Sequence, residues 1–345
     1  MRPFQYQRAE SLETAIRAAG TAKADGQPTQ ANSHFIAGGT TILDLMKLDV
    51  MRPATLVDIN ALGGTAASGR RLRSIEISDS GIRFGALVRM TQAAEHESVA
   101  RDYPVIADSL KLAASQQIRN MATLAGNVLQ RTRCTYFRDT SWAACNKRNP
   151  GSGCAAMDGV NRKHAVLGVS DQCIATYPGD FAQALIALDA RVQIAGPNGS
   201  REIAFAQLHR RPEGAPDIET QLRPDEIITS LDVPAGPWTR RSLYLKIRDR
   251  ESYEFALTSA AVALHIDGGI VRDARIALGG VATVPWRATD AETILNGKAL
   301  DETTAQAAAD AAFEGAQTRE ENSYKVRLGK RTLVRALLQA AKMEA

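Results

Sequence analysis

Residues 34–47 read His34-Phe35-Ile36-Ala37-Gly38-Gly39-Thr40-Thr41-Ile42-Leu43-Asp44-Leu45-Met46-Lys47 and contain the clearest local signal of fold class. An apolar run comes first, two glycines and two threonines follow it, and the remainder has the spacing of a short helix. A second apolar run occupies residues 55–59. The order of strand, glycine turn, helix and strand predicts a βαβ-like unit over roughly residues 34–60.

The two glycines at this turn suggest a binding site for phosphate. The backbone N–H groups of Gly38 and Gly39 are not covered by side chains, and the start of a helix carries partial positive charge. A second run of small and polar residues reads Thr123-Leu124-Ala125-Gly126-Asn127. Two such turns could hold both sides of a pyrophosphate, although an ordinary strand–helix turn explains the first one equally well. The glycine spacings of a Rossmann site and of a P-loop are not found.

The rest of the chain mixes helical and strand patterns, which predicts an α+β fold. Helical patterns cover residues 12–19, 91–97, 104–114, 179–188, 291–295, 302–312 and 325–341. Strand patterns cover residues 71–77, 81–87, 243–247, 256–266 and 270–281, and a further hairpin is expected around residues 196–199. The breaker cluster Pro234-Ala235-Gly236-Pro237 divides the chain into predicted domains at residues 1–236 and 237–345.

The composition is that of a globular protein. The chain has 345 residues, of which 44% are hydrophobic and 23% are charged, and domains of about 150 residues would make two. Lysine and arginine number 42 against 38 acidic residues, a net charge of +4, which argues against a nucleic-acid-binding surface. No apolar run approaches the roughly 20 residues of a membrane span. Residues 1–10 do not have the pattern of a secretory signal, so we expect export, if any, to depend on a signal-bearing partner.

All four cysteines fall within 40 residues, in a stretch with no clear period that we call the cysteine segment, residues 131–173. The spacing is Cys134-x10-Cys145-x8-Cys154-x18-Cys173. A long irregular loop inside a compact domain is uncommon unless it has a function. Four thiolates are the ligands of a [4Fe–4S] cluster or of zinc in an all-thiolate site. No pair has the Cys-x2-Cys spacing, which weakens the zinc interpretation, and unligated thiols or disulfides also remain open.

The charge around the cysteines favours the iron–sulfur interpretation. Seven basic residues lie between residues 131 and 163, and only Asp139 and Asp158 oppose them. A cluster with four thiolate ligands is net negative, so nearby cations and N–H donors stabilise it. Gly151, Ser152 and Gly153 beside Cys154 supply backbone donors that can approach sulfur.

Runs along nearly the whole chain resemble the FAD-binding subunit of molybdenum hydroxylases, the xanthine dehydrogenase and aldehyde oxidoreductase family. The resemblance rests on Phe35–Thr41, Leu56–Ile59, Ile82–Leu87, Gln117–Asn120, Thr123–Asn127, Tyr244–Arg248 and Ala277–Ala282. It implies a two-subdomain FAD-binding domain of the vanillyl-alcohol oxidase (PCMH) type over residues 1–236. A C-terminal α/β domain of the CO dehydrogenase flavoprotein type would follow over residues 237–345.

The cysteine segment narrows the resemblance to one branch of the family. Gln130–Cys134, Cys145–Arg148, Pro150–Cys154 and Cys173–Ala175 look like the flavin subunit of periplasmic aldehyde oxidoreductases. Members of that branch carry an additional [4Fe–4S] cluster in this subunit. The resemblance therefore implies that Cys134, Cys145, Cys154 and Cys173 ligate such a cluster.

The resemblance also implies which residues bind FAD. They are Ile36, Ala37, Gly38, Gly39, Thr40, Thr41, Ile42 and Leu43 in the first glycine segment, with Arg119, Thr123, Gly126, Asn127, Asp180, Ile228 and Lys246 beyond it. Ile228 would pack on the isoalloxazine ring, and Lys246 near its pyrimidine edge would favour the anionic reduced flavin. Without the resemblance, these two are an ordinary core residue and an exposed strand residue, and Asp180 is a helix cap. Glu254 stands where several relatives have an aspartate, so the use of NAD is not implied.

The expected function is electron transfer. The chain would be the FAD- and [4Fe–4S]-containing subunit of a molybdenum-dependent aldehyde oxidoreductase, an αβγ heterotrimer. Its partners would be a small [2Fe–2S] subunit and a large molybdopterin subunit, and electrons would leave to an external acceptor. The alternatives are a flavin subunit of a xanthine or N-heterocycle dehydrogenase and a zinc-stabilised binding module without redox function. No catalytic residues are expected, and the location would be periplasmic by co-export or else cytoplasmic.

Overall fold

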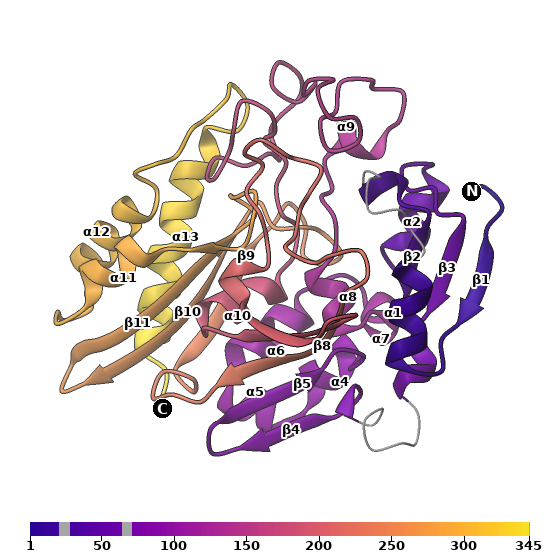
Figure 1. The fold of residues 1–345 in the computed structure, drawn as a ribbon. Coiled ribbons are helices and arrows are strands. Elements are labelled where there is room, and N and C mark those ends of the chain that lie inside the picture. The colour runs from indigo at the N-terminus through magenta and orange to yellow at the C-terminus, as the bar shows by residue number, and fades with distance from the viewer. Residues whose placement is uncertain (21–27, 64–70, 345) are drawn as a thin grey trace.

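A computed structural model describes residues 1–20, 28–63 and 71–344 of the chain. The described strands form three sheets flanked by helices, which confirms the predicted α+β fold. Figure 1 shows the N-terminal sheet on one side of the molecule, the C-terminal sheet on the other and the central sheet between them. None of the described helices is long and apolar enough to cross a membrane.

The N-terminal sheet is parallel and contains the predicted βαβ unit. Its strands lie in the order β1 (Gln5–Arg8), β3 (Thr55–Asp58) and β2 (Ser33–Ile36). Its helices are α1 (Leu12–Gly20), α2 (Ile42–Lys47), and the short 3-10 helices η1 (Pro28–Gln30) and η2 (Asn60–Gly63). Because β2 and β3 run in the same direction, the glycine turn after β2 and the turn after β3 lie at the same edge of the sheet.

The central sheet is antiparallel and includes both predicted hairpins. Its strands lie in the order β4 (Ile75–Ser78), β5 (Gly81–Gly85), β8 (Ile227–Pro234), β6 (Arg191–Gly196) and β7 (Gly199–Ala204). The helices of this region are α4 (Met90–Glu95), α5 (Glu97–Asp102), α6 (Pro104–Lys111), α7 (Gln116–Met121), α8 (Leu124–Val128), α10 (Phe181–Ala187) and η3 (Phe205–Gln207). Phe84 of β5 and Phe181 of α10 meet edge to face in the core, with ring centroids 6.3 Å apart.

The C-terminal sheet is also antiparallel, as the alternating patterns predict. Its order is β12 (Trp286–Arg287), β11 (Ile270–Gly279), β10 (Thr258–Asp267) and β9 (Ser242–Ile247). Its helices are α11 (Thr289–Leu295), α12 (Glu302–Ala312) and α13 (Tyr324–Ala341). The alanines on the inner faces of α12 and α13 are buried in one hydrophobic core with β10 and β11, because small side chains allow close packing of helix on sheet. They are Ala305, Ala308, Ala309, Ala312, Ala336 and Ala340.

The cysteine segment contains one short helix, α9 (Thr135–Arg138), and is otherwise irregular, as predicted. It crosses one end of the molecule, from the side of α2 to the side of α13 (Figure 1). Backbone hydrogen bonds join Val166 and Leu167 to the carbonyl of Val281, and the Asn322 side chain donates to Ala165. The segment is therefore held by the residues that directly follow β11 and directly precede α13.

Two local predictions differ from the structure. The helix predicted over residues 91–97 is two helices, because His96 adopts an extended conformation with φ −67° and ψ 122° between α4 and α5. The predicted turn at Thr123–Asn127 is instead the beginning of α8, where the Thr123 side chain accepts a hydrogen bond from the Gly126 N–H. Side-chain capping by Thr123 makes a helix of a run that has the composition of a turn.

Candidate functional site

The first glycine-containing segment, residues 36–43, packs against Met121 and Ala122, which directly precede the second, residues 123–127. A Cβ atom added at Gly38 would overlap with the carbonyl of Met121 and with the Cα atom of Ala122. Gly39 has φ +74°, a left-handed conformation that most side chains disfavour. The first segment therefore requires both glycines, one for close approach and one for backbone conformation.

The second segment presents polar groups that are partly unused. Gly126 donates its N–H to Thr123 Oγ1 at 3.2 Å. The Oδ1 atom of Asn127 is buried and has no hydrogen-bond partner within the described residues. A buried acceptor without a partner is rare, and one that borders a cavity is suited to a ligand that donates a hydrogen bond.

Arg89, Asn60 and Asp58 form a hydrogen-bonded network, which we call the clasp, that connects the two segments. Arg89 donates through Nη2 to Asn60 Oδ1 at 3.1 Å and through Nη1 to the carbonyl of Met121. Asn60 donates through Nδ2 to the carbonyl of Ala37 at 2.8 Å and to Asp58 Oδ1 at 2.7 Å. Burial opposes ionisation of Asp58, but hydrogen bonds from Tyr6 and Asn60 hold its pKa below the usual value. The clasp thus fixes the distance between the two glycine segments.

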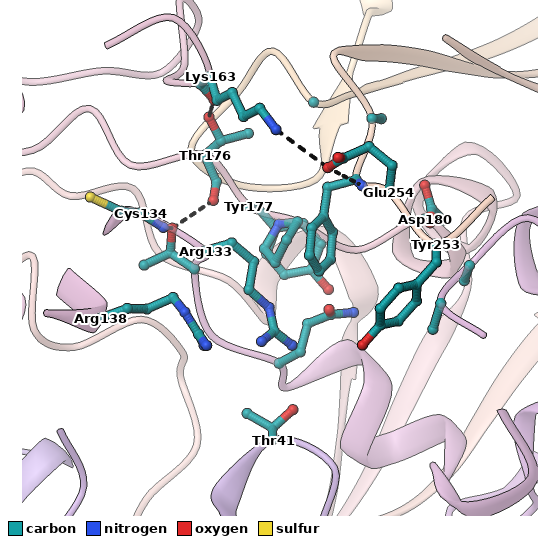
Figure 2. A pocket seen from close by; sticks show the side chains of 18 of the residues that line it. Thr41, Arg133, Cys134, Arg138, Lys163, Thr176, Tyr177, Asp180, Tyr253 and Glu254 are labelled. Atoms are coloured by element: carbon teal, nitrogen blue, oxygen red, sulfur yellow. Dashed lines mark hydrogen bonds and ion pairs between the residues drawn. The ribbon is translucent and has the colours of Figure 1, made fainter. Parts of the chain in front are cut away.

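A cavity of about 780 Å³ lies between these segments, the cysteine segment and the loop at residues 250–256. Ligand sites in proteins are usually cavities of about 300–1,000 Å³. Of the predicted FAD-binding residues, five line this cavity: Thr40, Thr41, Gly126, Asn127 and Asp180. Figure 2 shows Thr41 on one side of the pocket and Lys163 and Glu254 on the opposite side.

The other predicted residues do not line the cavity. These are Ile36, Ala37, Gly38, Gly39, Ile42, Leu43, Arg119, Thr123, Ile228 and Lys246. Ile228 is 2% exposed and lies in the central core. The Arg119 guanidinium donates to the carbonyl of Ala113 at 2.7 Å and to Gln116 Oε1 at 2.7 Å. In this structure the Ile228 side chain therefore packs in the core, and the Arg119 side chain stabilises the turn before α7.

Asp180 and Lys246 form a buried ion pair at the cavity wall. Their charged atoms are 2.7 Å apart, and both side chains are at most 5% exposed. The Tyr244 hydroxyl donates to Asp180 Oδ1 at 2.7 Å, and Lys246 also donates to the carbonyl of Leu112. Burial raises the pKa of Asp180, although Lys246 and Tyr244 stabilise its carboxylate. Lys246 thus acts on the cavity through Asp180 rather than by facing it.

Sequence reasoning missed the part that the cysteine segment plays in the cavity. Arg133, Cys134 and Arg138 line it, together with Tyr253 and Phe255 of the opposite loop. From the sequence, the basic residues of the segment indicate only a favourable environment for the cysteines. Cys134 follows Arg133 directly, so the cavity and the cysteine cluster are adjacent in space as well as in sequence.

The four cysteines gather around one small second cavity. All of them lie in the described part of the chain and are free thiols, so the disulfide alternative is not supported. Each sulfur receives at least one backbone N–H, from Phe137 at Cys134, Arg148 at Cys145, Ala156 at Cys154 and Ala175 at Cys173. Such donors stabilise thiolates. Burial raises the pKa of the Cys134 thiol to about 12, so a free thiol at this position stays protonated.

Polar side chains enclose the cysteine cluster. His164 Nε2 lies 3.2 Å from Cys134 Sγ, and burial, followed by the charge of Lys325, lowers the pKa of His164 to about 4. On the other side, Lys147 lies near Cys173 and forms an ion pair of 2.9 Å with Glu219, which also pairs with Arg131. Across the described residues, no three or more His, Cys, Asp or Glu side chains are close enough to hold a single metal ion.

Comparisons with known proteins agree with the arrangement of the fold. Residues 2–236 match the family model of the FAD binding domain in molybdopterin dehydrogenase, and residues 243–340 match that of the CO dehydrogenase flavoprotein C-terminal domain. The chain is 45% identical over 346 residues to the aldehyde oxidoreductase FAD-binding subunit PaoB of Escherichia coli (strain K12), with 99% of each chain covered.

More distant relatives share the same architecture. The glyceraldehyde dehydrogenase medium chain of Sulfolobus acidocaldarius is 25% identical over 299 residues, which cover 87% of this chain and 83% of that protein. A solved carbon monoxide dehydrogenase from Hydrogenophaga pseudoflava, lacking the Mo-pyranopterin moiety of its molybdenum cofactor, superposes with a TM-score of 0.72. It is 26% identical and covers 99% of this chain and 97% of its own.

Proposed function

Because the chain belongs to the family of FAD-binding subunits of molybdopterin dehydrogenases, we propose that it is the electron-transferring flavin subunit of an aldehyde oxidoreductase. Proteins of this family are oxidoreductase subunits, so a zinc-stabilised module without redox function is not supported. The name of the 45%-identical relative, an aldehyde oxidoreductase subunit, favours an aldehyde over a xanthine or another N-heterocycle as the substrate of the complex.

One observation carries the proposal: the cavity between the two glycine segments suits FAD. Gly38 has no room for a side chain, Asn127 Oδ1 is a buried acceptor without a described partner, and Thr40 and Thr41 add hydroxyl groups to the wall. Small residues and free polar groups of this kind accommodate a phosphate-containing cofactor. Bound FAD would supply the ability to accept two electrons singly and pass them to an external acceptor.

The chain's own residues would bind and orient that cofactor. The clasp of Asp58, Asn60 and Arg89 would hold the two glycine segments at a fixed separation. The buried Asp180–Lys246 pair would place a fixed dipole at the cavity wall. Aromatic residues Tyr253 and Phe255 border the opening and would limit the access of water.

We further propose that the four cysteines hold a [4Fe–4S] cluster. In such a cluster each thiolate binds a different iron atom. The gathering of all four cysteines at one cavity supports this assignment. The backbone N–H groups directed at each sulfur, and Lys147 near Cys173, fit the net negative charge of the cluster.

The partners and the compartment are part of the same proposal. We propose a heterotrimer with a [2Fe–2S] subunit and a molybdopterin subunit, where the substrate is oxidised. Relatives named as medium chains or FAD-binding subunits support a complex of several subunits. Export to the periplasm together with a signal-bearing partner would be measured by fractionation of cells that produce the whole complex.

The test is the cofactor content of the anaerobically purified protein. We expect one FAD per chain and about four iron and four labile sulfide per chain. The complex assembled with its partners should reduce an artificial acceptor when an aldehyde is added. A protein that contains no flavin after purification, and takes up none when FAD is supplied, would overturn the proposal. A protein with flavin but no iron would overturn only the part that concerns the cluster.

A further inference from the structure

Two guanidinium groups of the cysteine segment share one carboxylate beside the first glycine segment. Arg138 donates to Asp44 through Nη1 at 2.7 Å and through Nη2 at 3.1 Å, and Arg133 donates to the same carboxylate through Nη1 at 2.9 Å. Asp44 belongs to α2, which begins directly after Thr41. Two positive charges against one negative charge leave an excess of one positive charge at this wall of the cavity.

The donor capacity of these arginines is not exhausted. The Nε atom of Arg133 is buried and has no hydrogen-bond partner in the part of the chain that the structure describes. One face of the same guanidinium lies over the ring of Phe255, 5.1 Å from its centroid. Arginine has five N–H donors in a planar fork, and the ring fixes the orientation of this fork. A buried cationic donor without an acceptor is suited to bind an anionic ligand.

The excess charge lies on the side of the cavity where the first glycine segment is. In Figure 2 the guanidinium groups of Arg133 and Arg138 lie on the side of the pocket where Thr41 lies, and Lys163 lies on the other side. Among the other cations that line the cavity, Arg250 donates to the carbonyl of Tyr253. Arg162 pairs with Asp249 at 2.9 Å, and Lys163 pairs with Glu254 at 3.4 Å. An anion in the cavity would therefore be drawn toward Arg133 and Arg138.

We propose that Arg133 and Arg138 bind the pyrophosphate of FAD opposite Thr40 and Thr41, so that the cysteine segment is itself a part of the flavin site. This inference rests on the proposed function, since it concerns FAD in this cavity. Guanidinium groups bind phosphate oxygens through paired, charge-assisted hydrogen bonds. Asp44 holds both groups in place before the ligand arrives, which reduces the entropy lost on binding.

The test separates the phosphate part of FAD from its flavin part. Flavin-free full-length protein is titrated with FAD, with ADP and with riboflavin, for the wild type and for Arg133→Gln, Arg138→Gln and the double variant. Loss of a charge-assisted hydrogen bond corresponds to about a tenfold weaker affinity. We therefore expect FAD and ADP to bind about tenfold more weakly to each single variant and about 100-fold more weakly to the double variant. Riboflavin, which has no phosphate, should bind within about twofold of the wild type.

Two controls distinguish binding from folding. Arg162→Gln removes a cation from the other side of the same cavity and should leave the ratio of ADP to riboflavin affinity unchanged. The double variant with lysines at both positions keeps the charge but not the fork, and it should recover part of the ADP affinity. Thermal unfolding of each flavin-free variant identifies any that do not fold, in which case Arg138→Gln alone decides the question.

The outcomes are separable. If the wild-type protein binds FAD but the arginine variants bind ADP as tightly as it does, this inference is overturned and the proposed function stands. An equal loss of affinity for riboflavin and ADP would also overturn it, because the arginines would then act only on the structure. If the wild type binds neither FAD nor riboflavin, the proposed function itself fails.

Discussion

The first glycine segment and the cysteine segment line the same cavity, but different forces hold them in place. Residues 36–43 connect a strand to a helix, and their position is fixed by backbone pairing of β2 with β3 and by the close approach of Gly38 to Met121. Residues 131–173 have almost no regular structure. They are held by a few backbone hydrogen bonds, such as those of Val166 and Leu167 to Val281, and by ion pairs of Asp44 and Glu219 with arginine and lysine. A substitution in the first should act through steric overlap, and one in the second through charge.

The largest effect is expected where the backbone leaves no room. Gly38→Ala would place a methyl group into the Met121–Ala122 backbone and push the two glycine segments apart. We expect about a 100-fold loss of FAD affinity, measured by titration of the flavin-free protein. Gly315→Ala is the matched control, because a Cβ at Gly315 meets no atom within 4 Å. Unchanged FAD affinity in Gly38→Ala would show that the contact is not needed for the site.

Cys154→Ser examines the cysteine segment by itself. The variant should lose most of its iron and labile sulfide, because serine does not replace a cluster thiolate, while much of the flavin remains bound. Iron, sulfide and FAD per chain are the quantities to measure. Ser141→Ala, an exposed residue of the same segment, is the control and should keep all three. Normal iron in Cys154→Ser would refute the assignment of Cys154 as a ligand.

Glu219→Gln examines the ionic attachment of the cysteine segment. Burial opposes ionisation of Glu219, but Arg131 and Lys147 hold its pKa at about 2, against 4.5 ordinarily. Removing the charge leaves two cations unpaired, so near pH 7 we expect a loss of about 3 kcal/mol in the free energy of unfolding. Because the pKa of Glu219 is lower in the folded state, its ionised carboxylate stabilises that state above pH 4.5. This stabilisation is lost as the pH falls toward 2 and the carboxylate is protonated.

Urea denaturation at several pH values would follow this difference between Glu219→Gln and the wild type. The difference in free energy of unfolding between the two proteins should be constant between about pH 5 and 7 and should disappear as the pH falls from 4.5 toward 2. Glu213→Gln is the control, because Glu213 is exposed. A gap of the same size at every pH would mean that packing, and not charge, is lost.

The smallest effect is expected at the clasp. Arg89→Lys keeps a positive charge but cannot reach both Asn60 and Met121 with a single ammonium group. We expect FAD to bind about fivefold more weakly, with the flavin-free protein unfolding at nearly the same temperature. Arg52→Lys, an exposed residue that pairs with Asp49, should change neither quantity. If Arg89→Lys weakened FAD binding more than Gly38→Ala does, the proposed order of these two effects would be wrong.

Much of the fold could be predicted because its signals are local. The βαβ unit, the hairpins of the central sheet and the alanine-rich helices each follow from a period of apolar residues within one short stretch. The misread turn at Thr123–Asn127 shows where local signals end. Small residues suit a turn and a helix start equally well, and the hydrogen bond from Gly126 to Thr123 decides between them.

The individual residues of the site could be predicted from the sequence, but the contacts between them could not. The two glycine segments, the four clustered cysteines and the surplus of cations around them are evident from the residues alone, because glycine conformation, thiolate chemistry and charge belong to single residues. Folding in three dimensions pairs Lys246 with Asp180, brings Arg133 and Arg138 together on Asp44, and connects the two glycine segments through Arg89. Each of these contacts joins residues far apart in the chain, and no periodic pattern along a sequence records which distant side chains folding brings together.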